Sequence, residues 1–204
     1  MSIIKESSDE LNQPAVVTRA FIARAPRQRT ARDRLALAIA TVGVGYMPVA
    51  PGTWGSAIGV GIYLLARGLS AEGFAYAVAR GWSVPPLESF RMTFMLVMLI
   101  AITIVGIWAA SRAESLLGRK DPGAVVIDEV AGQLITFLFV PFNAGLWAIV
   151  AGFLAFRTFD IWKPYPIRRL EALESGLGIM ADDVLAGAYA ATLMSLLTSI
   201  YLLL

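Results

Sequence analysis

The stretch MTFMLVMLIAITIVGIWAAS, residues 92–111, constrains the fold of this chain more than any other segment. It contains no charged side chain. An α-helix rises 1.5 Å per residue, so a helix of this length covers about 30 Å, the thickness of the hydrocarbon core of a bilayer. We therefore expect residues 92–111 to form a membrane-spanning helix.

The composition agrees with a membrane protein. Hydrophobic residues make up 57% of the 204 residues and charged residues 16%, against roughly 45–50% and about 25% in ordinary soluble domains. An integral membrane protein is the leading class, and an unusually hydrophobic soluble helical bundle is the alternative. The formal net charge of +2 gives no basis for nucleic-acid binding, which would need a basic patch or stripe.

Two residue types are absent, and their absence limits the chemistry. The chain has no cysteine and no histidine. Disulfides, thiolate metal sites, cysteine nucleophiles, phosphohistidine intermediates and Ser-His-Asp triads are therefore excluded. Any reaction must use carboxylates, lysine, arginine, hydroxyls, backbone groups or a bound metal.

Other apolar segments predict further helices. We expect a second spanning helix over 184–204, a tight helical hairpin from 130–142 and 145–157, an apolar helix over 55–66, a re-entrant or interfacial segment over 35–47, and a polar loop over 68–90. The segment 35–47 is too short to cross a bilayer as a helix. The expected fold class is all-α, a polytopic helical membrane bundle with short or re-entrant helices.

Residues 1–34 form a separate region. They are polar and rich in arginine, and no apolar segment of a signal peptide follows the early charges. The acidic residues Glu6, Asp9 and Glu10 argue against a transit peptide. We interpret 1–34 as a basic, disordered tail on the cytoplasmic side and 35–204 as the membrane-embedded domain. With the tail in the cytoplasm, alternating helices bring 48–56, 121–129 and 157–183 to the cytoplasmic face.

Five of the carboxylates in those segments lie at the ends of expected helices. Asp128 and Glu129 begin one expected helix, Asp160 ends another, and Asp182 and Asp183 begin the last. One such acid alone would be explained by the positive end of a helix dipole, but an ionised carboxylate within a bilayer costs at least ~2.5 kcal/mol at mid-depth. Without cysteine or histidine, five acids on one face suit Mg²⁺ better than Zn²⁺. We predict a Mg²⁺ site.

Cations accompany the acids in FRTFDIWKPYPIRRL. Arg157 lies three residues before Asp160, on the same helix face, and Lys163 and Arg168 follow. Carboxylates combined with arginine and lysine are what a phosphate-plus-Mg²⁺ site requires. Arg169 is better explained as a charge that fixes membrane topology.

Two glycine-containing segments lie on the same face. In PVAPGTWGSAIG (48–59) we expect Thr53 to supply a capping hydroxyl and Gly55-Ser56 to open a helix, whose N-terminal N–H groups suit an anion. We interpret ESGLGIMADD (174–183) as a loop that delivers the last acid pair. Its glycines are also explained by turns alone.

Four motifs occur in order, namely PGTWGS, DPGAVVIDEVAG, FRTFDIWKPYPI and GLGIMADDVLAG, and each resembles a signature of the bacterial phosphatidylglycerophosphatase A family. The resemblance covers most of 35–204. It implies a multi-pass protein of the bacterial inner membrane, with a cytoplasmic active site, that uses Mg²⁺ to hydrolyse phosphatidylglycerophosphate to phosphatidylglycerol and phosphate. By motif position the family's acidic residues fall on Asp128, Glu129, Asp160, Asp182 and Asp183, with Arg157 and Lys163 beside them.

These observations give a hypothesis for the reaction. Asp128, Glu129, Asp160 and Asp183 would bind the metal, which activates a water for attack on phosphorus, and Asp182 or Asp183 would take the proton. Arg157 and Lys163 would stabilise the phosphoryl oxygens, and Thr53, Ser56 and Arg168 would complete substrate binding. The phospholipid substrate would stay in the bilayer.

Three other classes of protein remain as alternatives. A carboxylate cluster in a helical bundle also occurs in cation- or proton-coupled transporters, although these acids lie at the ends of segments beside basic residues. A non-catalytic assembly protein is the second alternative. A CDP-alcohol phosphotransferase would need an Asp-Gly-x-x-Ala-Arg pattern, which this chain lacks.

Overall fold

The structure is a computed structural model that describes residues 29–141 and 144–204, which form helices and loops with no β-strand among them. The helices are α1 (Ala31–Thr41), α2 (Pro51–Ala79), α3 (Val84–Leu117), α4 (Ile127–Thr136), α5 (Leu146–Trp162), α6 (Ile167–Leu170) and α7 (Ser175–Leu203). The all-α class expected from the sequence is confirmed for these residues.

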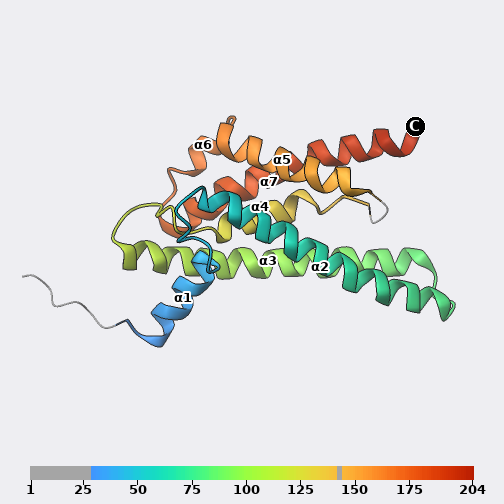
Figure 1. Cartoon of the computed structure of the whole chain (residues 1–204), viewed down its shortest axis with the longest axis horizontal. Coiled ribbons are helices and arrows are strands. Elements are labelled where there is room, and N and C mark those ends of the chain that lie inside the picture. The colour runs from blue at the N-terminus through green and yellow to red at the C-terminus, as the bar shows by residue number, and fades with distance from the viewer. Residues whose placement is uncertain (1–28, 142–143) are drawn as a thin grey trace, which may run out of the picture.

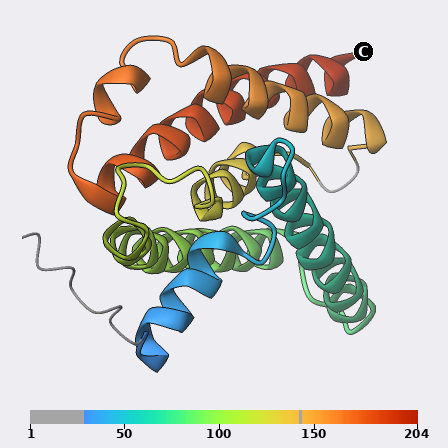
Figure 2. The same ribbon diagram turned by 60° about the vertical axis from the view of Figure 1, so that its left-hand side comes forward.

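Helix α4 lies at the centre of the molecule. It packs against α7, α2, α3 and α5, and Figure 2 shows it enclosed by these longer helices. Most of its side chains are buried. Its 10 residues cover about 15 Å, which is half of a bilayer core. The helix expected over 130–142 therefore has other limits, is shorter and cannot cross the bilayer by itself, and the apolar sequence of α4 reflects burial inside the protein. Residues 142–143 of the expected hairpin lie outside the described part.

Two helices, α3 and α7, are long and apolar enough to cross a membrane by length and composition. They agree with the spanning helices expected over 92–111 and 184–204, and both begin earlier than expected. Only 22% of the apolar window of α3 and 33% of that of α7 is buried, so most of these side chains are at least partly exposed. In Figure 1 α3 runs along the long axis of the molecule.

The polar loop expected over 68–90 is wrong. Helix α2 continues to Ala79, and α3 begins at Val84. The alanine-rich sequence AEGFAYAVA favours helix, and Pro85 is tolerated in the first turn of α3, where its missing N–H would have no helical partner.

Helix α1 begins inside the region expected to be a tail. Thr30 and Asp33 form a reciprocal capping box, so residues 31–34 are helical, whereas residues 1–28 lie outside the described part. The Asp33 carboxylate also pairs with Arg112 of α3 at 2.6 Å. Hydrogen bonds from the Thr30 backbone and the Arg112 side chain lower the pKa of Asp33 to about 2.

Helices α4 and α7 cross in direct backbone contact. A Cβ atom added at Gly187 would lie 2.4 Å from the carbonyl oxygen of Gly132, so only glycine fits there. Asp128 lies four residues before Gly132, and Asp183 lies four residues before Gly187. Because four residues are about one helical turn, this crossing brings the two acids to the same side of the helix pair.

The expected loop over 174–183 is also wrong, because α7 begins at Ser175 and includes the acid pair. Gly176 and Gly178 serve close packing here. A Cβ at Gly176 would lie 2.2 Å from the carbonyl oxygen of Ile107 on α3, and one at Gly178 would lie 2.4 Å from that of Leu173. Asp182 and Asp183 therefore sit on a rigid helix rather than at its entrance.

Candidate functional site

One polar cavity of about 350 Å³ collects most of the residues singled out in the sequence. Its walls come from the start of α2, the loop before α4, the first turn of α4, the end of α5 and the third turn of α7. The side chains that carry charge are Asp121, Asp128, Glu129, Arg157, Asp160, Lys163, Asp182 and Asp183. The three segments expected to meet on one face of the protein therefore meet in one cavity.

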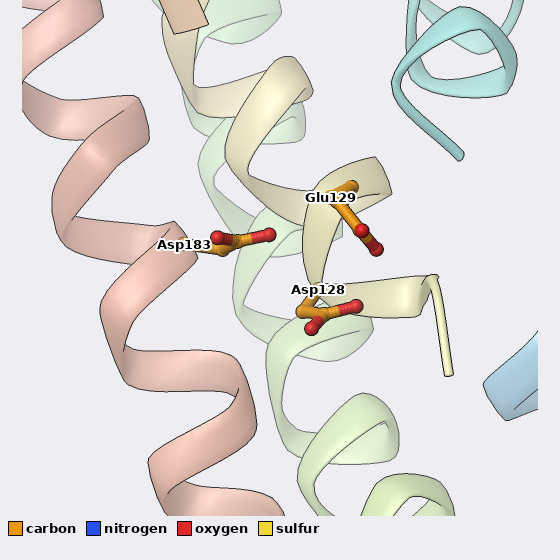
Figure 3. Close-up of side chains that lie close together, drawn as sticks. All are labelled: Asp128, Glu129 and Asp183. Atoms are coloured by element: carbon orange, nitrogen blue, oxygen red, sulfur yellow. The ribbon is translucent and has the colours of Figure 1, made fainter. Parts of the chain in front are cut away.

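Three carboxylates form a tight cluster in this cavity. Asp128 and Glu129 project from α4 and Asp183 from α7 (Figure 3). One oxygen from each lies within 4.8 Å of the others. The buried atoms Asp128 Oδ1, Glu129 Oε2 and Asp183 Oδ2 have no hydrogen-bond partner among the described residues. Buried carboxylate oxygens require a compensating partner, so the cluster has the character of a cation site.

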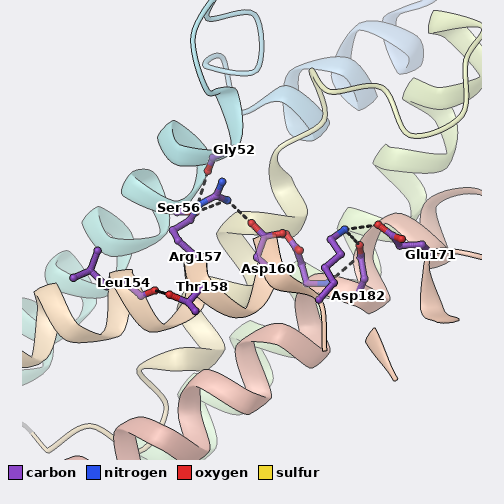
Figure 4. Close-up of polar contacts among 10 residues, drawn as sticks. Gly52, Ser56, Leu154, Arg157, Thr158, Asp160, Glu171 and Asp182 are labelled. Atoms are coloured by element: carbon purple, nitrogen blue, oxygen red, sulfur yellow. Dashed lines mark hydrogen bonds and ion pairs between the residues drawn. The ribbon is translucent and has the colours of Figure 1, made fainter. Parts of the chain in front are cut away.

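Arg157 joins α5 to α2 at the edge of the cluster. Its Nη1 atom pairs with the Asp160 carboxylate and lies 3.5 Å from the Ser56 hydroxyl, which donates to the Gly52 carbonyl at 2.9 Å. Figure 4 shows this chain of contacts. A Cβ at Gly52 would lie 2.2 Å from Glu129 Oε1, so the lack of a side chain at Gly52 lets α2 approach the acids.

Lys163 is the second basic residue that lines the cavity. It ends α5 in the left-handed backbone region, with φ of 48°, and its Nζ donates to Asp182 at 2.7 Å and to Glu171 at 2.6 Å. Partial burial alone would lower the pKa of the Lys163 ammonium, but these two carboxylates raise it above its usual value. Lys163 is therefore a fixed positive charge.

Several predicted site residues lie elsewhere. Thr53 is exposed and does not line the cavity, and α2 has Ala50 at its N-cap with no side-chain cap, so the predicted capping role of Thr53 is wrong. Arg168 is exposed on α6, where Nη2 contacts the Trp162 carbonyl at 3.5 Å. Ser56 is fully buried and does not line the cavity, although its hydroxyl contacts the Arg157 guanidinium.

The sequence interpretation missed two acids near the cavity. Asp121 lines it with a left-handed backbone, φ 44°, and Glu171 binds Lys163 from an exposed position. Asp121 opens the DPGAVVIDEVAG motif, which was a usable signal. Glu171 had none, because its contact depends on how the chain turns after α5.

The comparison with protein families decides the identity of this arrangement. The model of the family described as phosphatidylglycerophosphatase A matches residues 37–198. The chain belongs to the phosphatidylglycerophosphatase A family. The matched range contains every charged residue of the cavity, and the resemblance stated from the four motifs is thereby confirmed.

Curated relatives agree with this membership. The chain is 32% identical to phosphatidylglycerophosphatase A of Escherichia coli, over 74% of this chain and 76% of the relative. It is 34% identical to the protein of the same name from Haemophilus influenzae, over 72% and 78%. A protein of Bacteroides thetaiotaomicron, provisionally named a phosphatidylinositol-3-phosphatase, is 38% identical over 75% and 86%. No solved structure matches the chain.

Membership of this family makes the chain a phosphatase and does not favour the transporter alternative. Together with the apolar helices α3 and α7, it also indicates a membrane protein.

Proposed function

We propose that this protein hydrolyses phosphatidylglycerophosphate to phosphatidylglycerol and inorganic phosphate with the help of Mg²⁺. The observation that carries the proposal is the cluster of Asp128, Glu129 and Asp183, whose oxygens converge within 4.8 Å and have no hydrogen-bond partner among the described residues. Family membership and the names of two relatives supply the substrate.

The donor atoms of the cluster fit magnesium. All three are carboxylate oxygens, which are the ligands that Mg²⁺ prefers, and the cavity offers no thiolate or imidazole that would favour zinc. Asp128, Glu129 and Asp183 would hold the ion, and Asp160 lines the same cavity. When bound, Mg²⁺ would neutralise phosphoryl charge and lower the pKa of a water.

The basic residues would bind and orient the phosphate. Arg157 and Lys163 both line the cavity and have separate contacts, Arg157 with Ser56 and Lys163 with Asp182, so a phosphate bound there would receive N–H donors from both. Such donors stabilise the charge that builds up on phosphoryl oxygens in the transition state. Asp160 would hold the guanidinium of Arg157 in place.

A carboxylate would accept the proton of the attacking water. The P–O bond to the glycerol oxygen breaks as a new P–O bond to the water oxygen forms, and the leaving alkoxide takes up a proton to give the free hydroxyl. Asp182 is held by Lys163 at 2.7 Å, and Asp183 has one buried oxygen without a hydrogen-bond partner among the described residues. Because Asp183 is also proposed to hold the ion through one carboxylate oxygen, the proton would go either to the second oxygen of Asp183 or to Asp182.

The location follows from the substrate. We propose a multi-pass arrangement in the bacterial inner membrane with the cavity open to the cytoplasm, so that the acyl chains stay in the bilayer while the headgroup enters the cavity. The apolar helices α3 and α7 support this arrangement.

Activity of the purified full-length chain tests the proposal. Phosphate release from phosphatidylglycerophosphate should require Mg²⁺. Asp128→Asn, Asp183→Asn and Lys163→Ala should each lower kcat/KM by at least ~10²-fold, the effect of removing a charge-stabilising group. The matched control is Glu72→Gln, an exposed acid on α2 outside the cavity, which should keep normal activity. Near-normal turnover in all three cavity variants would refute the site.

A second substrate belongs in the same assay because of the Bacteroides thetaiotaomicron relative. We expect phosphatidylinositol 3-phosphate to be hydrolysed more slowly than phosphatidylglycerophosphate. A reversed preference would keep the phosphatase mechanism and change the proposed substrate.

A further inference from the structure

A second cavity of about 330 Å³ lies between α1 and the last turns of α3, and the reaction proposed above does not use it. It is lined by Arg32, Trp108, Ser111, Arg112 and Ser115. None of these side chains lines the carboxylate cavity. Two guanidinium groups and two hydroxyls are the donors that proteins use to bind phosphate.

Of the two arginines that line this cavity, one has a positive charge that is not balanced by a described carboxylate. The Arg112 guanidinium is neutralised by the buried Asp33 carboxylate at 2.6 Å. The Arg32 guanidinium lies 5.7 Å from the centroid of the Trp108 ring and forms no ion pair with any described residue. The cavity therefore matches a ligand with one negative charge. No acid lines it, so an ammonium group would find no partner there.

The face of α3 that leads to the cavity changes character along its length. Val97 and Ile104 are 60% and 62% exposed. The same helix face continues, at steps of three or four residues, through Trp108, then Ser111 or Arg112, and then Ser115. Aliphatic side chains are thus followed by a tryptophan and then by polar donors. This order matches the passage from hydrocarbon to headgroup region across a bilayer surface, where tryptophan is enriched.

We propose that this cavity binds the phosphodiester of an anionic phospholipid. One acyl chain would lie along Val97 and Ile104, and the phosphate would receive donors from Arg32 and from the hydroxyls of Ser111 and Ser115. Basic cavities beside membrane helices are suited to such headgroups. The proposal requires α3 to cross the membrane and does not depend on the phosphatase reaction.

The site is connected to the helix that carries the acids. The Ser111 hydroxyl accepts a hydrogen bond from the backbone N–H of Gly176 at 3.1 Å, and Gly176 belongs to the first turn of α7. A lipid bound at Ser111 would therefore lie next to the start of the helix on which Asp182 and Asp183 sit.

Lipid binding to the full-length chain tests this proposal without an activity assay. The protein in phosphatidylcholine bilayers is titrated with phosphatidylglycerol that carries brominated acyl chains, which quench nearby tryptophan. The difference in quenching between the wild-type protein and Trp108→Phe gives the part that comes from Trp108, and this part reports on the cavity. We expect phosphatidylglycerol to quench Trp108 at lower mole fractions than brominated phosphatidylcholine, and Arg32→Gln to weaken this preference about tenfold, the effect of a lost charge-assisted contact.

The matched control is Arg34→Gln, an exposed arginine on the same helix that does not line the cavity, which should leave the preference unchanged. Equal weakening by both substitutions would overturn the proposal, because it would indicate general attraction to a negative surface. The same conclusion would follow if both lipids quench equally. Displacement of the lipid by millimolar inorganic phosphate would show that the acyl chain is not recognised and would also overturn it.

Discussion

Lys163 touches two carboxylates of different kinds, the buried Asp182 and the exposed Glu171. The buried partner fixes the position of the ammonium at the cavity wall. The contact with exposed Glu171 competes with hydration by water, and exposed ion pairs of that kind contribute little free energy. The two contacts should therefore differ strongly in importance.

We predict that Glu171→Gln lowers kcat/KM by no more than about threefold, because an exposed pair is worth little, while Lys163→Ala removes the charge that faces the phosphate. Steady-state kinetics with phosphatidylglycerophosphate distinguish the two. If Glu171→Gln were as damaging as Lys163→Ala, Glu171 would take part in the reaction itself.

Asp33 should make the stability of the protein depend on pH. Its folded pKa of about 2 lies below the ordinary value of 3.8. The resulting stabilisation is fully present above the ordinary pKa and is lost as the pH falls from about 4 towards 2. We expect Asp33→Asn to lower Tm at neutral pH and the difference from wild type to shrink over that acidic range. Glu174→Gln, at an exposed acid, should give a difference that does not change in this way.

At the residue scale the sequence was informative wherever residue type alone sets the chemistry. The five acids, Arg157 and Lys163 all line one cavity. Thr53 and Arg168 do not, because the direction of a side chain depends on where a helix begins. The helix was expected to begin near Gly55, whereas α2 begins at Pro51. This earlier start turns the side chain of Thr53 outward.

At the scale of elements, glycines control how closely α2 approaches the acids. Gly52 and Gly59 both lie where a Cβ would clash, with Glu129 and Gln133 of α4 respectively. Gly61 on the same helix has no atom within 4 Å of such a Cβ. Gly61→Ala is therefore a matched control for Gly52→Ala on the same helix.

We predict that Gly52→Ala displaces the Glu129 carboxylate and lowers activity by about tenfold or more, with little loss of stability because the clash is with the end of a flexible side chain. Gly61→Ala should leave activity unchanged and stabilise the helix by up to about 1 kcal/mol. Thermal unfolding and phosphate release measure the two effects. Equal behaviour of both variants would mean that the close approach of α2 has no role.

Two errors about elements arose because the surroundings of a segment cannot be read from its own sequence. Apolar sequence predicts that a segment avoids water, but it does not separate burial in protein from burial in lipid. This is why the sequence of α4 suggested a crossing helix. Likewise, Gly176 and Gly178 suggested a loop, because the backbone of α3 against which Gly176 packs is more than sixty residues away in the chain and no local pattern reveals it.

At the scale of the whole molecule, the sidedness of the membrane can be tested directly because the chain has no native cysteine. Trp82 and Arg119 lie just outside the two ends of α3, and Arg119 is close in sequence to the cavity residue Asp121. We predict that Arg119→Cys is labelled by an impermeant maleimide only after the cells are opened, and that Trp82→Cys is labelled in intact cells.

Labelling of both positions from the same side would show that α3 does not cross. The opposite pattern, with position 119 outside, would keep the crossing and place the cavity on the outer face. The two results therefore separate the topology of α3 from the location of the site.

The contact between Gly132 and Gly187 bears on which ion the proposed site would accept. Because the main chains of α4 and α7 touch there, the spacing of the backbones that carry Asp128 and Asp183 is set by this contact. Calcium needs oxygens at 2.3–2.6 Å and more of them, whereas magnesium needs about 2.0–2.1 Å. If the cluster holds Mg²⁺ as proposed, we expect this helix contact to favour the smaller ion, and we expect enlarging either glycine to reduce that preference before it abolishes binding.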